Sequence, residues 1–153
     1  MYNCLAKNGG KSMFDRKKLE VMDIVFADEA HERFFREKVR ELPNSRMDGK
    51  ELAMIYTLGI SDMTRSCFSG IVDLKTEQMN PKALFAGWQT SQTVKITRLA
   101  MNLYTGFCQT VNRDDSDEGY YFGENSRDYT VEELFDCIYA KYFLEAVKLR
   151  YEI

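Results

Sequence analysis

Apolar residues at helical spacing are the feature that most constrains the fold of this 153-residue chain. The clearest stripe follows Ser91 at intervals of three and four, and it contains Ile96, Leu99, Ala100, Leu103 and Phe107. Such spacing is typical of a helix that buries one face in a core. Similar stripes over residues 28–42 and 130–151 predict two more long helices. Because the chain has only two prolines, helix is the dominant expected structure.

Start and stop signals predict shorter helices between these stripes. Pro43 ends the first long helix, and Gly59 closes the next one, since glycine adopts a left-handed cap at low cost. A further helix is expected over residues 61–72, with Met63, Cys67, Phe68 and Ile71 on its buried side. Asn80 followed by Pro81 is a start signal for a short helix.

The last helix begins at a capping box formed by Thr130 and Glu133. We expect it to run unbroken to about Tyr151, with one side formed by Leu134, Ile138, Tyr142, Ala146 and Leu149. The fold class is therefore predicted to be mainly α, a single-domain bundle of five to six helices that can include a short strand or hairpin. Residues 21–26 are expected to form either a strand or an entry segment that packs on the same core. The aromatic cluster 120–122 is expected either to fold back on the core or to form a short strand.

A domain boundary is expected near residue 20. Residues 1–20 are polar and contain Asn8, Gly9 and Gly10, so they are interpreted as a flexible N-terminal arm. Residues 21–153 are predicted to form one helical domain, a length sufficient for a hydrophobic core.

Composition excludes several classes of protein. The formal net charge of −3 argues against a protein whose main work is binding nucleic acid. No apolar run approaches the roughly 18 residues that cross a bilayer, and the N-terminus lacks the apolar core of a signal peptide. We expect a cytoplasmic protein that does not bind membranes, with reduced cysteines and no cofactor.

Motifs for catalysis or metal binding are not found. His31 is the only histidine and belongs to no zinc motif, so a structural role is favoured over a titrating or metal-binding one. The four cysteines form no Cys-x-x-Cys pair and are expected to be buried and unreactive. No catalytic or metal-binding residue is therefore predicted.

The single tryptophan lies in "GWQT", between a helix-ending glycine and the long stripe. A core position is favoured for Trp88, because large aromatic residues are usually mostly buried. If the tryptophan is exposed, it forms a candidate binding patch. The other members of this patch are Gln89, Thr90, Lys95 and Arg98.

Two Thr-Arg pairs place Arg65 and Arg98 near apolar stripes. The favoured interpretation is an ion pair between helices, for instance with Asp62 or Asp73. The alternative is a pair of anion-binding side chains.

Four segments carry a family resemblance. They are "FADEAHERFF", "YTLGISDMTRSCFSGIVD", "MNPKALFAGWQTSQTVKITRLAMNLYTG" and "YTVEELFDCIYAKYFLEAVKLRY". The chain resembles an uncharacterised family of small proteins from Gram-positive bacteria and their mobile elements. The resemblance implies a domain that begins near residue 20, and it implies no activity.

These observations favour a non-enzymatic interaction protein, encoded by a phage or mobile element, that inhibits a host or defence protein. An acidic protein of this kind can occupy a basic, nucleic-acid-binding surface of its partner. The alternative is a small enzyme or an anion- or nucleotide-binding domain that uses Arg65 and Arg98. Direct DNA binding is the least favoured, because Lys95 and Arg98 are the only basic residues of the candidate recognition helix.

Overall fold

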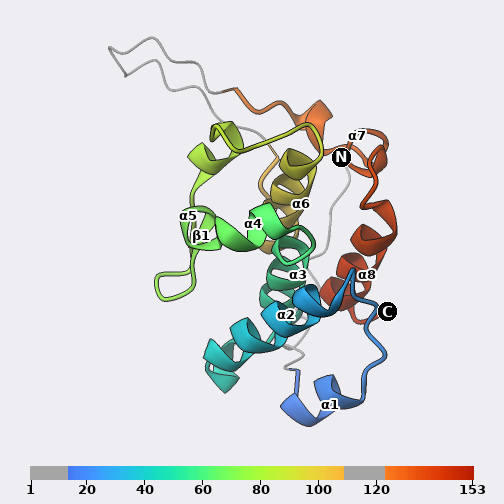
Figure 1. The fold of residues 1–153 in the computed structure, drawn as a ribbon. Coiled ribbons are helices and arrows are strands. Elements are labelled where there is room, and N and C mark those ends of the chain that lie inside the picture. The colour runs from blue at the N-terminus through green and yellow to red at the C-terminus, as the bar shows by residue number, and fades with distance from the viewer. Residues whose placement is uncertain (1–13, 109–122) are drawn as a thin grey trace, which may run out of the picture.

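The computed structural model of the protein describes residues 14–108 and 123–153 and is mainly helical, as the sequence predicts (Figure 1). The first half contains α1 (Arg16–Val21), α2 (Glu29–Glu41), the 3₁₀ turn η1 (Asn44–Arg46), α3 (Gly49–Leu58), α4 (Asp62–Ser66) and α5 (Phe68–Ile71). The second half contains β1 (Val72–Asp73), β2 (Gln78–Met79), η2 (Pro81–Phe85), α6 (Thr93–Thr105), η3 (Ser126–Tyr129), α7 (Val131–Phe135) and α8 (Ala140–Tyr151).

Helix α3 lies at the centre of the fold and packs against α2, α6 and α8 (Figure 1). Every residue of this helix except Lys50 is buried, because its sequence GKELAMIYTL is apolar on nearly all sides. A helix that is apolar all round is stable only when other elements surround it. The three longest amphipathic helices provide these surroundings.

Helix α2 confirms the prediction for residues 28–42. The Asp28 side chain accepts a hydrogen bond from the His31 amide at 2.7 Å, which caps the first turn. Phe35, Val39 and Leu42 are buried, as their spacing predicts.

Strands β1 and β2 form a short antiparallel hairpin in which Val72 pairs with Met79. The predicted mainly α class with a short hairpin is therefore confirmed. Residues 22–28 form no strand; they enter α2 as an irregular segment in which Ile24 is buried and Phe26 packs on the core. The cluster 120–122 lies outside the described residues.

The helix predicted over residues 61–72 is divided into α4 and α5 by Cys67. Thr64, Phe68 and Ile71 are buried. Met63, predicted to be buried, is 40% exposed. The short helix α4 turns Thr64 toward the core in its place.

The last helix is not continuous, which corrects the prediction of an unbroken helix from Thr130 to Tyr151. Helix α7 ends at Phe135 and α8 begins at Ala140. Side chains of α6 compensate for the backbone bonds lost at this break: Lys95 donates to the Asp136 carbonyl at 2.7 Å, and Gln92 accepts from the Ile138 amide at 3.1 Å. As a result Ile138, predicted to face the core, is 73% exposed.

The start of the chain also differs from the prediction of a flexible arm up to residue 20. Residues 16–21 form α1, capped by Asp15, and both Phe14 and Leu19 are buried. The Phe14 amide donates to the Met47 carbonyl at 2.8 Å, so this segment packs against the core. The rest of the predicted arm, residues 1–13, lies outside the described part of the chain. None of the described helices is long and apolar enough to span a membrane.

Candidate functional site

The "GWQT" segment forms the cap of α6. The Thr90 hydroxyl accepts from the Thr93 amide at 3.1 Å, and its carbonyl accepts from the Val94 amide at 3.0 Å. These contacts satisfy amide groups that the first turn of a helix leaves unpaired. Thr90 is exposed, but its hydroxyl and carbonyl groups form hydrogen bonds within the protein.

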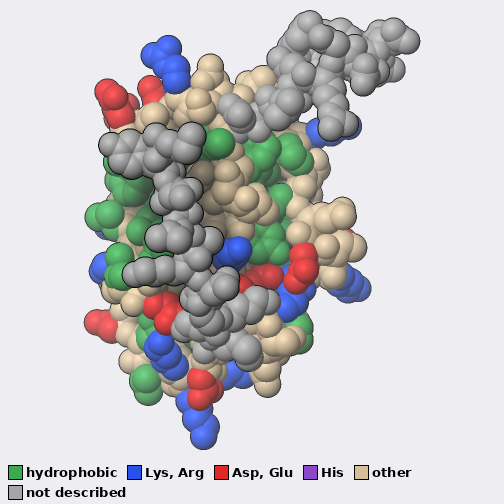
Figure 2. All heavy atoms as spheres, turned by 180° about the vertical axis from the view of Figure 1, so that it is seen from behind, with side chains coloured by type: hydrophobic (Ala, Val, Ile, Leu, Met, Phe, Trp, Pro, Cys, Tyr) green, Lys and Arg blue, Asp and Glu red, His purple; other side chains and the backbone are tan. Residues whose placement is uncertain are grey.

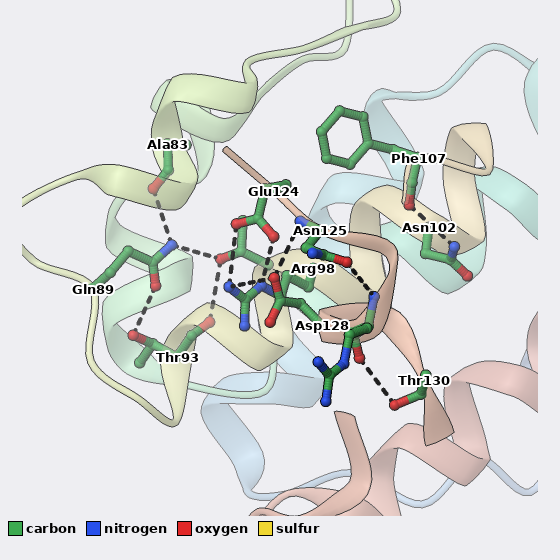
Figure 3. A network of polar contacts seen from close by, with 12 residues as sticks. Ala83, Gln89, Thr93, Arg98, Asn102, Phe107, Glu124, Asn125, Asp128 and Thr130 are labelled. Atoms are coloured by element: carbon green, nitrogen blue, oxygen red, sulfur yellow. Dashed lines mark hydrogen bonds and ion pairs between the residues drawn. The ribbon is translucent and has the colours of Figure 1, made fainter. Parts of the chain in front are cut away.

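Gln89 connects the cap to the preceding turn (Figure 3). Its side-chain nitrogen donates to the Ala83 carbonyl at 3.1 Å and to the Thr97 hydroxyl at 2.9 Å. Its side-chain oxygen accepts from the Thr93 hydroxyl at 2.8 Å. The amide thus holds η2 against α6 rather than pointing to solvent.

Trp88 is partly buried and packs on the core, and Lys95 is bound to the Asp136 carbonyl. The structure therefore places these two candidate residues in contacts within the protein. A role of either residue in binding a partner stays a prediction.

Arg98 is the centre of an ion-pair cluster (Figure 3). Its guanidinium donates to both carboxylate oxygens of Glu124, at 3.0 and 3.3 Å, and lies 3.8 Å from Asp128. The Glu124 side chain is only 1% exposed. This bidentate geometry is typical of a strong arginine–carboxylate pair. The pair fixes the segment before η3 to α6.

Arg65 has different partners. Its guanidinium donates to the Gly59 carbonyl at 2.7 Å and lies 3.9 Å from Asp28. Both arginines are thus engaged in contacts within the chain, but with Asp28, Glu124 and Asp128 instead of the suggested Asp62 or Asp73. The two side chains share no partner, so the geometry does not join them into one anion site.

His31 has a structural position. Its ring is fully buried, accepts from the Ala27 amide through Nδ1 at 3.1 Å, and contacts the Tyr56 carbonyl through Nε2 at 2.8 Å. The second contact requires a proton on Nε2, so the ring is the neutral Nε2–H form. Burial lowers the pKa of His31 to about 4. These contacts agree with the structural role that the sequence favours.

Within residues 14–108 and 123–153, no group of three His, Cys, Asp or Glu side chains is arranged to hold a metal ion. Cys67, Cys108 and Cys137 are free thiols, and burial raises the pKa of the Cys137 thiol, which makes it less nucleophilic at neutral pH.

Exposed apolar and acidic side chains occur on α7 and in the connection between α7 and α8. Val131 and Ile138 are each 73% exposed. Glu132 and Glu133 lie between them in the sequence, are exposed, and have no salt-bridge partner in the described part of the chain. We call these four residues the α7 surface. In the view from behind, acidic side chains lie at the upper left, where α7 is located (Figure 2).

Residues 21–153 match a family described as a family of unknown function (DUF6075). The chain belongs to this family. DUF6075 covers all the elements from α2 to α8 and leaves most of α1 outside. No curated protein matches the chain, and no solved structure matches it. Membership of DUF6075 thus supports the expected relationship to an uncharacterised domain and adds no activity.

The sequence did not point to the α7 surface. Within an unbroken helix, Ile138 belongs to the core stripe, so its exposure could not be inferred from spacing. The only local signal was the pair of adjacent glutamates after the Thr130 cap, which is also the usual composition of a helix first turn.

Proposed function

We propose that this DUF6075 protein is a non-enzymatic interaction protein that binds a partner protein through the α7 surface. The observation that supports this proposal is the exposure of Val131 and Ile138, together with two exposed glutamates that have no salt-bridge partner in the part of the chain that the structure describes. Burial of such apolar side chains in an interface is favourable by about 25 cal/mol for each Å² removed from water. The carboxylates give the contact its charge preference.

The chemistry of the α7 surface favours a basic partner surface. Surfaces that bind nucleic acid are basic because they neutralise phosphates. We therefore propose inhibition of a host or defence protein that acts on nucleic acid as the specific form of this function. Origin from a phage or mobile element of Gram-positive bacteria remains part of this proposal.

An affinity-capture experiment tests the proposal. The intact protein, a variant with Glu132→Gln and Glu133→Gln, and a variant with Val131→Ser and Ile138→Ser are used as baits in extracts of the encoding cell. Matched controls carry Glu29→Gln with Glu37→Gln, or Val21→Ser with Val25→Ser, all at exposed positions on other elements. Circular dichroism confirms that every bait is folded.

The expected result is a protein that the intact chain and both controls capture and that both α7 variants lose at least fivefold. Capture that is equal for all five baits would show that the α7 surface is not the binding surface, and the proposal would be abandoned.

A further inference from the structure

A groove lies between α1 and the second half of α2, on elements separate from the α7 surface. Its floor is apolar and is formed by Leu19, Phe35 and Val39. Its rim carries Arg16, Arg36 and Arg40, with Glu20 on the α1 side. Figure 1 shows α1 at the lower end of the molecule and α7 at the upper end. The groove is therefore a second surface, independent of the proposed function.

The rim is positively charged although the whole chain is acidic. Arg16 donates to the Asn44 side chain at 2.9 Å and to the Leu42 carbonyl at 2.8 Å, and neither acceptor cancels its charge. Arg40 is exposed and has no ion-pair or hydrogen-bond partner among the described residues. Arg36 pairs with Glu32 at 2.7 Å in an exposed pair, which contributes little and can exchange for another carboxylate.

The size of the groove decides what kind of ligand it fits. Its volume is about 230 Å³. Sites for whole small molecules such as nucleotides are larger, about 300–1,000 Å³. An apolar floor of this size instead fits one side chain, and the arginine rim fits carboxylates on either side of it.

We propose that the α1–α2 groove binds an acidic segment of a partner protein that inserts one apolar side chain between Leu19, Phe35 and Val39. Arg16 and Arg40 contact the flanking carboxylates. Arg36 also contacts one when its ion pair with Glu32 is replaced by a pair with the ligand. Charge complementarity selects this occupant, since a basic segment would meet three arginines on the rim and an uncharged one would leave them unused. Glu20 opposes the ligand and limits its affinity.

A titration of the full-length protein tests this proposal. The probe is the peptide acetyl-Glu-Glu-Leu-Glu-Glu-amide, and binding is followed by the shifts of backbone amide resonances in a ¹H–¹⁵N spectrum. Two further peptides, one with Ser in place of Leu and one with Lys in place of every Glu, test the apolar and the acidic requirement separately. Titrations at low and high salt test the electrostatic contribution.

Variants on the groove and beside it provide the controls. Arg40→Gln removes a rim charge that has no partner among the described residues, whereas Arg33→Gln removes another exposed arginine of α2 that does not line the groove. Glu20→Gln removes the opposing charge. Light scattering on the free protein tests whether a second copy of the chain occupies the groove.

We expect saturable shifts confined to residues 16–20 and 35–40, weakened at least fivefold by Arg40→Gln and unchanged by Arg33→Gln. Glu20→Gln should strengthen binding roughly two- to fivefold, which is typical for one exposed charge. High salt and both altered peptides should weaken binding.

Absence of shifts at millimolar peptide, or equal effects of Arg40→Gln and Arg33→Gln, would overturn the proposal. A dimer that Arg40→Gln alone dissociates would overturn it in favour of a second copy as occupant. Because the titration uses no residue of the α7 surface, its outcome is separate from that of the capture experiment.

Discussion

At the scale of single residues, Gly49 is required by the close approach of two helices. A Cβ atom at this position would lie 2.5 Å from the Arg150 carbonyl oxygen and 3.0 Å from that of Leu149. Both are backbone atoms of the last turn of α8, so they cannot move aside as a flexible side chain could. Gly49 thus allows the start of α3 to contact the end of α8.

Gly49→Ala is expected to lower the free energy of unfolding by about 1–3 kcal/mol, the usual cost of forcing extra volume into a packed site. Urea denaturation measures the change. Gly87→Ala is the control, because a Cβ there meets nothing within 4 Å, and its effect should be within about 0.5 kcal/mol. Equal losses in the two variants would contradict this account of Gly49.

His31 makes stability depend on pH. Burial lowers its pKa in the folded protein from 6.5 to about 4, while the unfolded chain keeps the ordinary value. The unfolded state therefore binds more protons below pH 6.5, and stability is lost as pH falls from about 6.5 toward 4. Arg65 also disfavours the charged ring, whereas Asp28 favours it.

We expect the free energy of unfolding to fall by about 1.5 kcal/mol between pH 6.5 and 5 because of His31 alone. The slope approaches about 1.36 kcal/mol per pH unit only where the unfolded histidine is protonated and the folded one is not. Comparison with His31→Gln over this range separates the histidine from the carboxylates. The variant should be less stable at pH 7 and lose less stability on acidification. Parallel pH profiles would show that His31 is not the titrating group.

At the scale of elements, the sequence predicts the features that depend on neighbouring residues, such as helix caps. Asp28 caps α2 and Asn80 caps η2, as the sequence predicts. The Thr130 hydroxyl accepts a hydrogen bond from the Glu133 amide at 3.3 Å. The complete reciprocal box lies one turn earlier, between Asn125 and Asp128. Caps are predictable because the donor and the acceptor lie within a few residues of one another.

Features that depend on distant residues could not be predicted in this way. The break between α7 and α8 contains no proline or glycine, and Gln92 and Lys95 of α6 stabilise it from more than 40 positions away in sequence. Helix α1 similarly depends on the contact of Phe14 with Met47. The candidate residues of the "GWQT" segment could be located, but their partners within the fold could not.

Ion pairs of Arg98 with Glu124 and Asp128 connect η3 and the segment before it to α6. Arg98→Gln removes the arginine that pairs with the buried Glu124 carboxylate, so we expect a loss of about 3–5 kcal/mol. Arg36→Gln breaks the exposed pair with Glu32 and should cost less than about 1 kcal/mol.

Thermal and urea denaturation measure both effects. The double variant Arg98→Gln with Glu124→Gln should recover part of the loss, because it removes the buried charge. A loss for Arg98→Gln no larger than that for Arg36→Gln would contradict a buried pair.

At the scale of the whole molecule, the described residues present two candidate binding surfaces. Most apolar residues of α3 and α6 pack in the core, and Gln89 and Arg98 of the predicted binding patch have partners within the chain. The α7 surface and the α1–α2 groove remain, with opposite charge. The predicted site residues thus have contacts within the fold, and their binding role stays a prediction, whereas the α7 surface lies on an element that the sequence did not single out.

Cross-linking in living cells tests the central proposal most directly. A photo-reactive amino acid replaces Glu132 in one protein and Glu37 in another, and both sites are exposed glutamates without an ion-pair partner in the described residues. If the α7 surface binds a partner, irradiation should yield one discrete cross-linked protein from position 132 and none from position 37. The same products from both positions, or none from position 132 in the cells that encode the protein, would contradict the proposal.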